Sequence, residues 1–294
     1  MPADLAPPLV RNRVSATRPY AVIDEREPDT AGRVATATTI FLTASECPIG
    51  CTMCDLWQNT LPNPTPTGAI ARQIDVALEN RVPGDWIKLY NSGNFFDAAS
   101  IPVNDYQSIA KRCAPFSRVI VENHPRFGSR RLPAFRDLLS GQLEVAVGLE
   151  TVQPRWLSRL NKQMTRDDFD RYAKWLLNEG VDLRVFLIVG VPEVSAREAV
   201  QWATLSARHA CLQGARHISL IPARAGHGWN GKASTLPTLS MADLCALQST
   251  AIADVDGRCN VTVDLWDLTK RVTTPEDNAI VQQISQTNVT QCPA

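Results

Sequence analysis

The sequence lacks an excess of charge of either sign, because its 30 Lys and Arg residues balance its 30 Asp and Glu residues. This balance removes the general electrostatic case for a nucleic-acid partner, although it leaves room for a local basic patch. The chain also lacks a run of about 18 consecutive apolar residues, the length that a membrane-spanning helix needs. We therefore expect no membrane association.

No secretory signal is recognisable either, since residues 1–10 contain no basic region followed by an apolar run. The expected location is the cytoplasm, where disulfides are rare and clustered cysteines act as metal ligands or redox groups. What the chain does have is an ordinary globular composition, 44% hydrophobic and 20% charged, which excludes a disordered or fibrous protein. A chain of 294 residues can bury a sizeable core.

Short apolar runs alternate with segments of helical period along most of the chain. The predicted strands are 36–43, 86–90, 118–121, 143–149, 183–189 and 217–221, with 261–265 as a further candidate. The predicted helices are 69–80, 104–112, 132–139, 166–178, 195–211 and 241–254. Strands that alternate with helices form parallel units with right-handed crossovers. The sequence therefore predicts an α/β fold, a barrel or a doubly wound sheet, with its chemistry at the carboxyl ends of the strands.

The same pattern divides the chain into three regions. Residues 1–33 are rich in Pro, Arg and Asp and have no clear period, so we expect an N-terminal extension there. Residues 34–235 carry the alternation and form the expected core. Residues 236–294 form a C-terminal extension that we expect to pack on that core.

The most informative motif follows the first predicted core strand, where Cys47, Cys51 and Cys54 have the spacing C-x3-C-x2-C. Three thiolates on one short loop can wrap one corner of an iron–sulfur cluster, and a 4Fe–4S cluster needs four ligands. One iron would then keep an open position for a substrate, by analogy with catalytic zinc.

Two other interpretations of this loop are a structural zinc site and three unligated thiols. A zinc ion would need a fourth ligand, for which the sequence offers Asp55, His124 or His227. The remaining cysteines show no C-x2-C spacing, and we expect most of them to be small buried apolar residues: Cys113, Cys211, Cys245, Cys259 and Cys292.

The cysteine motif, placed after the first strand of a six-unit α/β pattern, resembles that of the radical S-adenosylmethionine (SAM) superfamily. The resemblance implies a partial (β/α)6 TIM-like barrel with short terminal extensions. It also implies a 4Fe–4S cluster on Cys47, Cys51 and Cys54, with SAM bound at the fourth iron. In that family the reduced cluster cleaves SAM to methionine and a 5′-deoxyadenosyl radical that abstracts a hydrogen atom, and a flavodoxin or ferredoxin supplies the electron. Most members have an aromatic residue where this chain has Met53.

Two further strand ends carry the resemblance. Asn91, Ser92 and Gly93 stand where the family has a Gly-Gly-Glu-like segment that contacts the methionine amino group. Glu122 resembles the carboxylate that follows the third strand, near the SAM amino group and ribose. The resemblance thus implies that these four residues bind SAM.

Later segments resemble the branch that contains the Elongator catalytic subunit and the methylthiotransferases. Glu150 matches a fourth-strand position, and Lys162 matches a basic residue placed against the SAM carboxylate. Ile221 and Pro222 match the sixth-strand loop near adenine. Phe186 stands where the branch often has an acidic residue, so one expected adenosine contact is missing or supplied elsewhere.

Within this branch the short motifs are most similar to those of the archaeosine synthase radical SAM subunit. The resemblance implies an enzyme that abstracts hydrogen from a small-molecule or nucleoside substrate, although the sequence assigns no individual catalytic residue. A tRNA-modifying radical SAM enzyme and a non-catalytic iron–sulfur binding protein are the alternatives. Neutral charge and the short chain after residue 240 argue against tRNA as a partner of this chain alone. His124 and His227, on loops at the expected active face, are candidates for substrate contact.

Overall fold

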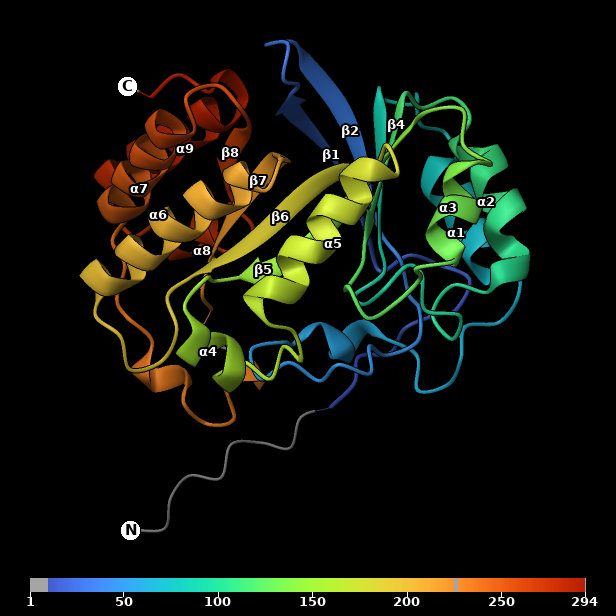
Figure 1. Cartoon of the computed structure of the whole chain (residues 1–294), viewed down its shortest axis with the longest axis horizontal. Helices are drawn as coiled ribbons and strands as arrows, with labels where there is room; N and C mark the ends of the chain where they lie inside the picture. The colour runs from blue at the N-terminus through green and yellow to red at the C-terminus, as the bar shows by residue number, and fades with distance from the viewer. Residues whose placement is uncertain (1–9, 225–226, 294) are drawn as a thin grey trace.

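The structure is a computed structural model that describes residues 10–224 and 227–293. One eight-stranded sheet with strands in sequential order curves into a nearly closed barrel (Figure 1). Its strands are β1 (Ala21–Pro28), β2 (Val34–Phe41), β3 (Trp86–Tyr90), β4 (Arg118–Glu122), β5 (Gln142–Glu150), β6 (Asp182–Val189), β7 (Ala215–Pro222) and β8 (Asn260–Val263). Strand β1 pairs antiparallel with β2, and every later neighbour pairs in parallel. The predicted TIM-like α/β barrel is confirmed, because a doubly wound sheet would reverse its strand order at a switch point.

Helices surround the barrel, with α1 to α3 on one side, α6 and α7 on the other, and α5 between them in the view of Figure 1. The helices are α1 (Ala69–Leu78), α2 (Tyr106–Cys113), α3 (Arg131–Arg136), α4 (Pro154–Arg159), α5 (Arg166–Asn178), α6 (Ala196–Leu212), α7 (Met241–Val255), α8 (Leu268–Arg271) and α9 (Pro275–Thr290). Short 3-10 turns cover Leu56–Asn59, Val103–Asp105, His227–Trp229 and Ala233–Thr235. Local sequence fixes several of the helix starts. Thr165 and Ser240, for example, open α5 and α7 with capping boxes that satisfy free backbone amides.

Strand β3 shows how the sheet separates an apolar core from a polar interior. Ile87 and Leu89 point outward and join the main core between the strands and the helices. Lys88 and Tyr90 alternate with them and line the cavity inside the barrel. The functional groups therefore come from the inward-facing positions of the strands and from the loops that follow them.

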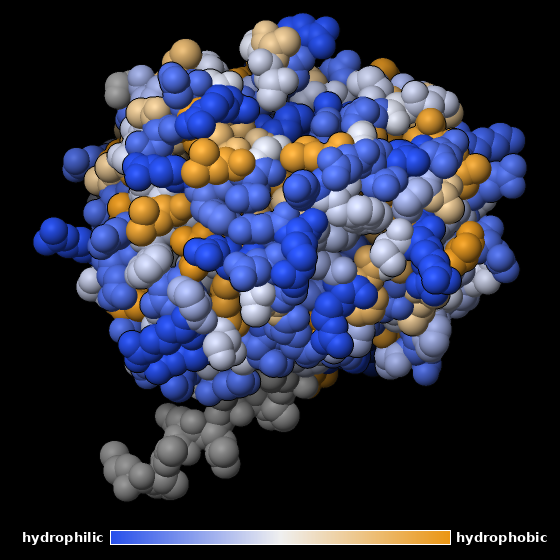
Figure 2. Space-filling view, in the orientation of Figure 1, coloured by the Kyte–Doolittle hydropathy of each residue, from blue (hydrophilic) through white to orange (hydrophobic). Residues whose placement is uncertain are grey.

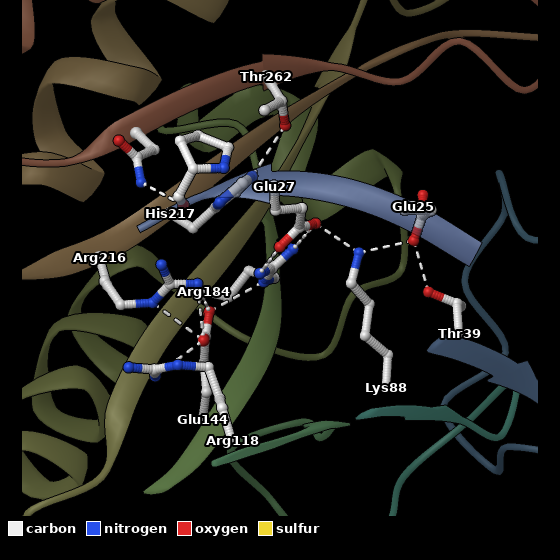
Figure 3. A network of polar contacts seen from close by, with 12 residues as sticks. Glu25, Glu27, Thr39, Lys88, Arg118, Glu144, Arg184, Arg216, His217 and Thr262 are labelled. Carbon is white, nitrogen blue, oxygen red and sulfur yellow. Dashed lines mark hydrogen bonds and ion pairs between the residues drawn. The ribbon is translucent and has the colours of Figure 1, made fainter. Parts of the chain in front are cut away.

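Charged residues fill the middle of the barrel (Figure 3). The fully buried Arg184 donates to Glu27 at 2.9 and 2.7 Å and to Glu144 at 2.9 Å. Lys88 pairs with Glu25 at 2.7 Å and also with Glu27. Burial alone would raise the pKa of Glu144, but the arginine charges around it outweigh burial and lower the pKa to about 2.

Strand β1 supplies two carboxylates of this network, although it belongs to the segment that the sequence marks as an N-terminal extension. Its last residue, Pro28, accepts a hydrogen bond at 2.9 Å from Asn260 on β8. Side-chain amides of the C-terminal segment complete the free edge of β8, since Asn288 and Gln291 bond the backbone of Val263 and Val261. Strand β8 thus contacts both β1 and the C-terminal segment through side-chain amides.

The outer surface is mostly polar on the face shown in Figure 2, where apolar residues lie scattered among charged ones. In the ranges 10–224 and 227–293, no helix has both the length and the apolar character that crossing a membrane requires.

Candidate functional site

A cavity of about 1420 Å³ occupies the barrel and opens at the carboxyl ends of the strands. It brings together nearly all the site residues that the sequence analysis singles out. Those that line it are Cys47, Cys51, Cys54, Ser92, Gly93, Glu122, Glu150, Lys162, Ile221 and Pro222. Asn91 is the exception, because its side chain is buried away from the cavity and donates to Ser100 Oγ at 2.7 Å.

The cysteine loop holds three free, half-buried thiols. Burial raises the pKa of each, that of Cys54 to about 11. Asn94 Nδ2 donates a hydrogen bond to Cys47 Sγ at 3.2 Å, a contact that the sequence analysis did not assign. Since an amide donor stabilises a thiolate, Asn94 belongs to the site.

The segment between α4 and α5 fixes the shape of the cysteine loop. Asn161 Nδ2 donates to the carbonyl of Gly50 at 2.9 Å, and Gln163 Nε2 donates to that of Ile49 at 2.7 Å. Gly228 packs on the other side, where a Cβ would lie only 2.2 Å from the carbonyl oxygen of Met53. The loop is therefore held from both sides by segments distant in sequence.

The cysteine loop supplies thiol ligands without a convergent group for a single ion in the described residues. Within residues 10–224 and 227–293, no three His, Cys, Asp or Glu side chains converge on one point as the ligands of a zinc ion would. Asp55 and His124 thus do not complete a tetrahedral site with the thiols, and the side chain of His227 lies outside the described residues. The three free thiols line one cavity, and cysteine thiolates are the ligands that a 4Fe–4S cluster takes, each on a different iron.

Glu122 is enclosed by the turn that follows β3. Its carboxylate accepts hydrogen bonds from the backbone N–H groups of Asn91, at 3.1 Å, and of Ser92 and Gly93. Burial nevertheless dominates and raises the pKa of Glu122 to about 7. Ser92 adopts a positive φ of 54° and its hydroxyl lies 3.0 Å from that of Tyr20. The turn and Glu122 therefore form one unit on the cavity wall.

Glu150 and Lys162 form a second unit, a buried ion pair with Nζ to Oε1 at 2.7 Å. Burial alone would lower the pKa of Lys162, but Glu150 and the neighbouring Cys51 outweigh burial and raise it. The pair depends on a glycine, since a Cβ at Gly148 would lie 2.3 Å from Glu150 Oε1 and 2.5 Å from Lys162 Nζ. It places a positive charge beside the thiols.

His124 also lines the cavity, and both of its ring nitrogens have protein partners. Nδ1 lies 3.2 Å from the backbone N–H of Arg126 and accepts from it, so the proton is assigned to Nε2, which donates to the carbonyl of Lys162 at 2.9 Å. Burial and the nearby Lys162 lower the pKa of His124 to about 4. A neutral His124 thus positions the backbone that carries Lys162.

Aromatic side chains form another part of the cavity wall. Phe186 faces the cavity with its ring 5.9 Å from that of Tyr90, so an apolar surface stands where the family resemblance implies an acid. Phe41 contacts Trp266 with a centroid distance of 5.5 Å and lies 5.6 Å from Tyr20. The rings of this wall come from strands and loops far apart along the chain.

The other cysteines lie outside the cavity lining. Cys113, Cys211 and Cys259 are buried, as expected for small apolar residues, whereas Cys245 is half-buried and Cys292 is exposed. Cys259 forms a side-chain hydrogen bond with Cys211, and burial raises the pKa of Cys259. These thiols therefore belong to the packing between strands and helices.

No protein-family model matches the chain. Among curated proteins, an uncharacterised protein of Methanocaldococcus jannaschii is 24% identical over 191 residues, covering 61% of this chain and 52% of that protein. The archaeosine synthase subunit beta of Methanosarcina acetivorans is 26% identical over 160 residues, covering 52% of this chain and 46% of the subunit. The chain spans about half the length of these curated relatives.

Solved structures of similar fold include a methylornithine synthase, with a TM-score of 0.57 and 11% identity over 83% of this chain and 70% of that one. The Elp3 protein of Methanocaldococcus infernus matches with a TM-score of 0.55 and 12% identity over 76% of this chain and 59% of that one. SuiB of Streptococcus suis matches with a TM-score of 0.57 and 14% identity over 76% of this chain and 47% of that one. These neighbours are radical SAM enzymes, and the resemblance seen in the sequence is confirmed at the level of the fold.

Proposed function

We propose that this chain, which has the fold of the radical SAM enzymes, binds a 4Fe–4S cluster through Cys47, Cys51 and Cys54 and cleaves SAM reductively. The observation that carries the proposal is the convergence of three free thiols, the Glu122 turn and the Glu150–Lys162 pair on one cavity. When bound and reduced, the cluster supplies the electron that splits SAM into methionine and a 5′-deoxyadenosyl radical, which abstracts a hydrogen atom from the substrate. A flavodoxin or ferredoxin is the proposed electron donor.

The chain's own residues bind and orient the reactants. Lys162 offers a cation to the carboxylate of SAM, and Glu122 offers oxygen atoms to its ammonium group or its ribose hydroxyls. Ile221 and Pro222 present an apolar surface for adenine. The aromatic wall reduces the access of water, which would otherwise quench a reactive radical. The substrate is proposed to be a small molecule or a nucleoside held in the remaining volume.

The test uses protein purified without oxygen and reconstituted with iron and sulfide. Wild type is compared with the Cys47→Ala, Cys51→Ala, Cys54→Ala triple variant, and with Cys245→Ala as a control outside the cavity lining. We expect about four irons per chain and 5′-deoxyadenosine by mass spectrometry from wild type and the control, and neither from the triple variant. A loaded cluster that yields no 5′-deoxyadenosine under reduction would favour a non-catalytic iron–sulfur protein. Full iron content in the triple variant would refute the ligand assignment.

A further inference from the structure

We propose that the cavity recognises a substrate with a positively charged nitrogen next to a flat apolar group, and that Asp264 binds the nitrogen. The proposal rests on the proposed function, because it names the class of substrate that the same site takes. It is carried by the position of Asp264 on the cavity wall, by the ion pairs around it and by the rings beside it.

Asp264 is a cavity carboxylate without a protein counter-ion in the described part of the chain. It directly follows β8, and its Oδ1 accepts the backbone N–H of Trp266 at 2.9 Å. Arg224, a cation close enough to affect the titration of Asp264, is engaged by Asp267 at 3.0 Å and by Asp55 at 3.5 Å. Burial raises the pKa of Asp264, with Glu25 and Asp267 adding to the rise and Arg224 opposing it. A buried carboxylate is costly unless it is paired, so a ligand cation would stabilise it.

The other charges in the cavity disfavour an anionic substrate at this position. Glu25 and Asp267 both face Asp264 closely enough to influence its titration. The buried cations that line the cavity, Lys88, Lys162 and Arg184, each have a carboxylate partner. A carboxylate of a ligand bound here would be repelled by these negative charges. An ammonium or amidinium group would instead donate a hydrogen bond to a carboxylate acceptor.

Aromatic rings adjoin this carboxylate. Trp266 lies two residues after Asp264, is 45% exposed at the mouth of the cavity, and contacts Phe41 with a centroid distance of 5.5 Å. Tyr90 lies 6.2 Å from Phe41 and continues the wall inward. Ring faces favour both planar apolar groups and cations, so the wall and Asp264 select complementary parts of one molecule.

The placement also suits the proposed reaction. Arg224 bridges Asp267 to Asp55, the residue directly after Cys54, so the segment after β8 is tied to the cysteine loop. A substrate anchored by Asp264 therefore extends through the same cavity that the three cysteines line.

The test compares two indole probes that differ in one group, tryptamine, with an ammonium, and tryptophol, with a hydroxyl. Binding to anaerobically reconstituted wild type is measured by titration calorimetry. We expect tryptamine to bind at least about tenfold more tightly, since a charge-assisted hydrogen bond is worth more than a neutral one. Asp264→Asn retains the oxygen that accepts from Trp266 and is expected to reduce the preference to about twofold or less. Asp137→Asn, the same charge change at an exposed position, should keep the preference.

Trp266→Leu provides a second test and should weaken both probes alike, because the ring contributes stacking surface to each. Equal binding of the two probes to wild type, no binding of either, or an unchanged preference in Asp264→Asn overturns the proposal. The readout does not require SAM cleavage. A preference without 5′-deoxyadenosine would refute the proposed function alone, and 5′-deoxyadenosine without a preference would refute this inference alone.

Discussion

Replacing Gly228 with alanine tests whether the loop after β7 fixes the cysteine loop. An added Cβ would lie 2.2 Å from the carbonyl oxygen of Met53 and 2.3 Å from its carbonyl carbon. Non-bonded contacts of this kind stay above about 3 Å, so the two backbones would have to separate by about 1 Å. No rotamer change relieves a clash with main-chain atoms, and such overpacking costs about 1–3 kcal/mol. Cys54 follows Met53 and would move with it.

Gly228→Ala is therefore expected to lower the Tm by several degrees and to reduce the iron bound per chain after reconstitution. Calorimetry and iron analysis measure the two effects. Gly231→Ala is the matched control, because its Cβ would meet no atom within 4 Å. Its positive φ of 83° costs about 1 kcal/mol but leaves the cysteine loop in place. Wild-type iron and Tm in Gly228→Ala would refute the close approach, and equal iron loss in the control would refute its link to the cysteines.

Three other predictions concern the charged groups. Arg184→Met removes a buried cation that pairs with two buried carboxylates and should lower the free energy of unfolding by about 3–5 kcal/mol in urea titrations, against less than about 1 kcal/mol for the exposed Arg171→Met; similar losses would contradict the network. The pKa of Glu144 falls from its ordinary value of 4.5 to about 2 on folding, so its contribution is present above pH 4.5 and is lost as the pH falls toward 2. Acid titrations of stability should be flatter in Glu144→Gln, and identical curves would count against the shift. Gly148→Ala should keep the fold, because the added Cβ contacts only the ends of the Glu150 and Lys162 side chains. It should displace Lys162 and weaken SAM binding at least about tenfold in equilibrium titrations. An unchanged affinity would show that SAM binding does not need the ion pair.

Much of the barrel could be predicted because its strands and helices carry their own local pattern. The predicted strand 86–90 and helix 166–178 coincide with β3 and α5. Strand β3 is a short, almost continuously buried run, and the buried positions of α5 repeat with the helical period after the capping residue Thr165.

Strand β1 could not be predicted in the same way, because its inward positions are charged. Glu25 and Glu27 alternate as strand residues do, but their partners Lys88 and Arg184 are distant in sequence. A local window therefore shows only a short apolar start, at residues 21–23, followed by charged residues. The C-terminal helix α9 was not predicted either, because few of its residues are buried and its sequence shows only a weak apolar period.

The cysteines could be identified from their spacing, whereas most other features of the site depend on the tertiary fold. Asn94 reaches Cys47 only because the turn after β3 lies next to the cysteine loop. Asp264 lines the cavity because β8 pairs with β7 and because Arg224 connects the following segment to Asp55. Such contacts leave no repeat or motif in the sequence.

The contacts that β1 makes with residues far along the chain have a consequence for synthesis on the ribosome. The ion pair between Glu27 and Arg184 can form only after 157 further residues have been synthesised. The hydrogen bond from Asn260 to the carbonyl of Pro28 can form only after 232 further residues. At about 5–20 residues per second, the second interval lasts roughly 10–50 s. During this interval the outer edge of β1 carries charged side chains, because Lys88, which follows 61 residues after Glu27, offsets only part of their charge. Charge of this kind discourages strands of other nascent chains from adding to the edge. The glutamates that later neutralise the barrel interior thus also protect the hairpin while its partners are still being made.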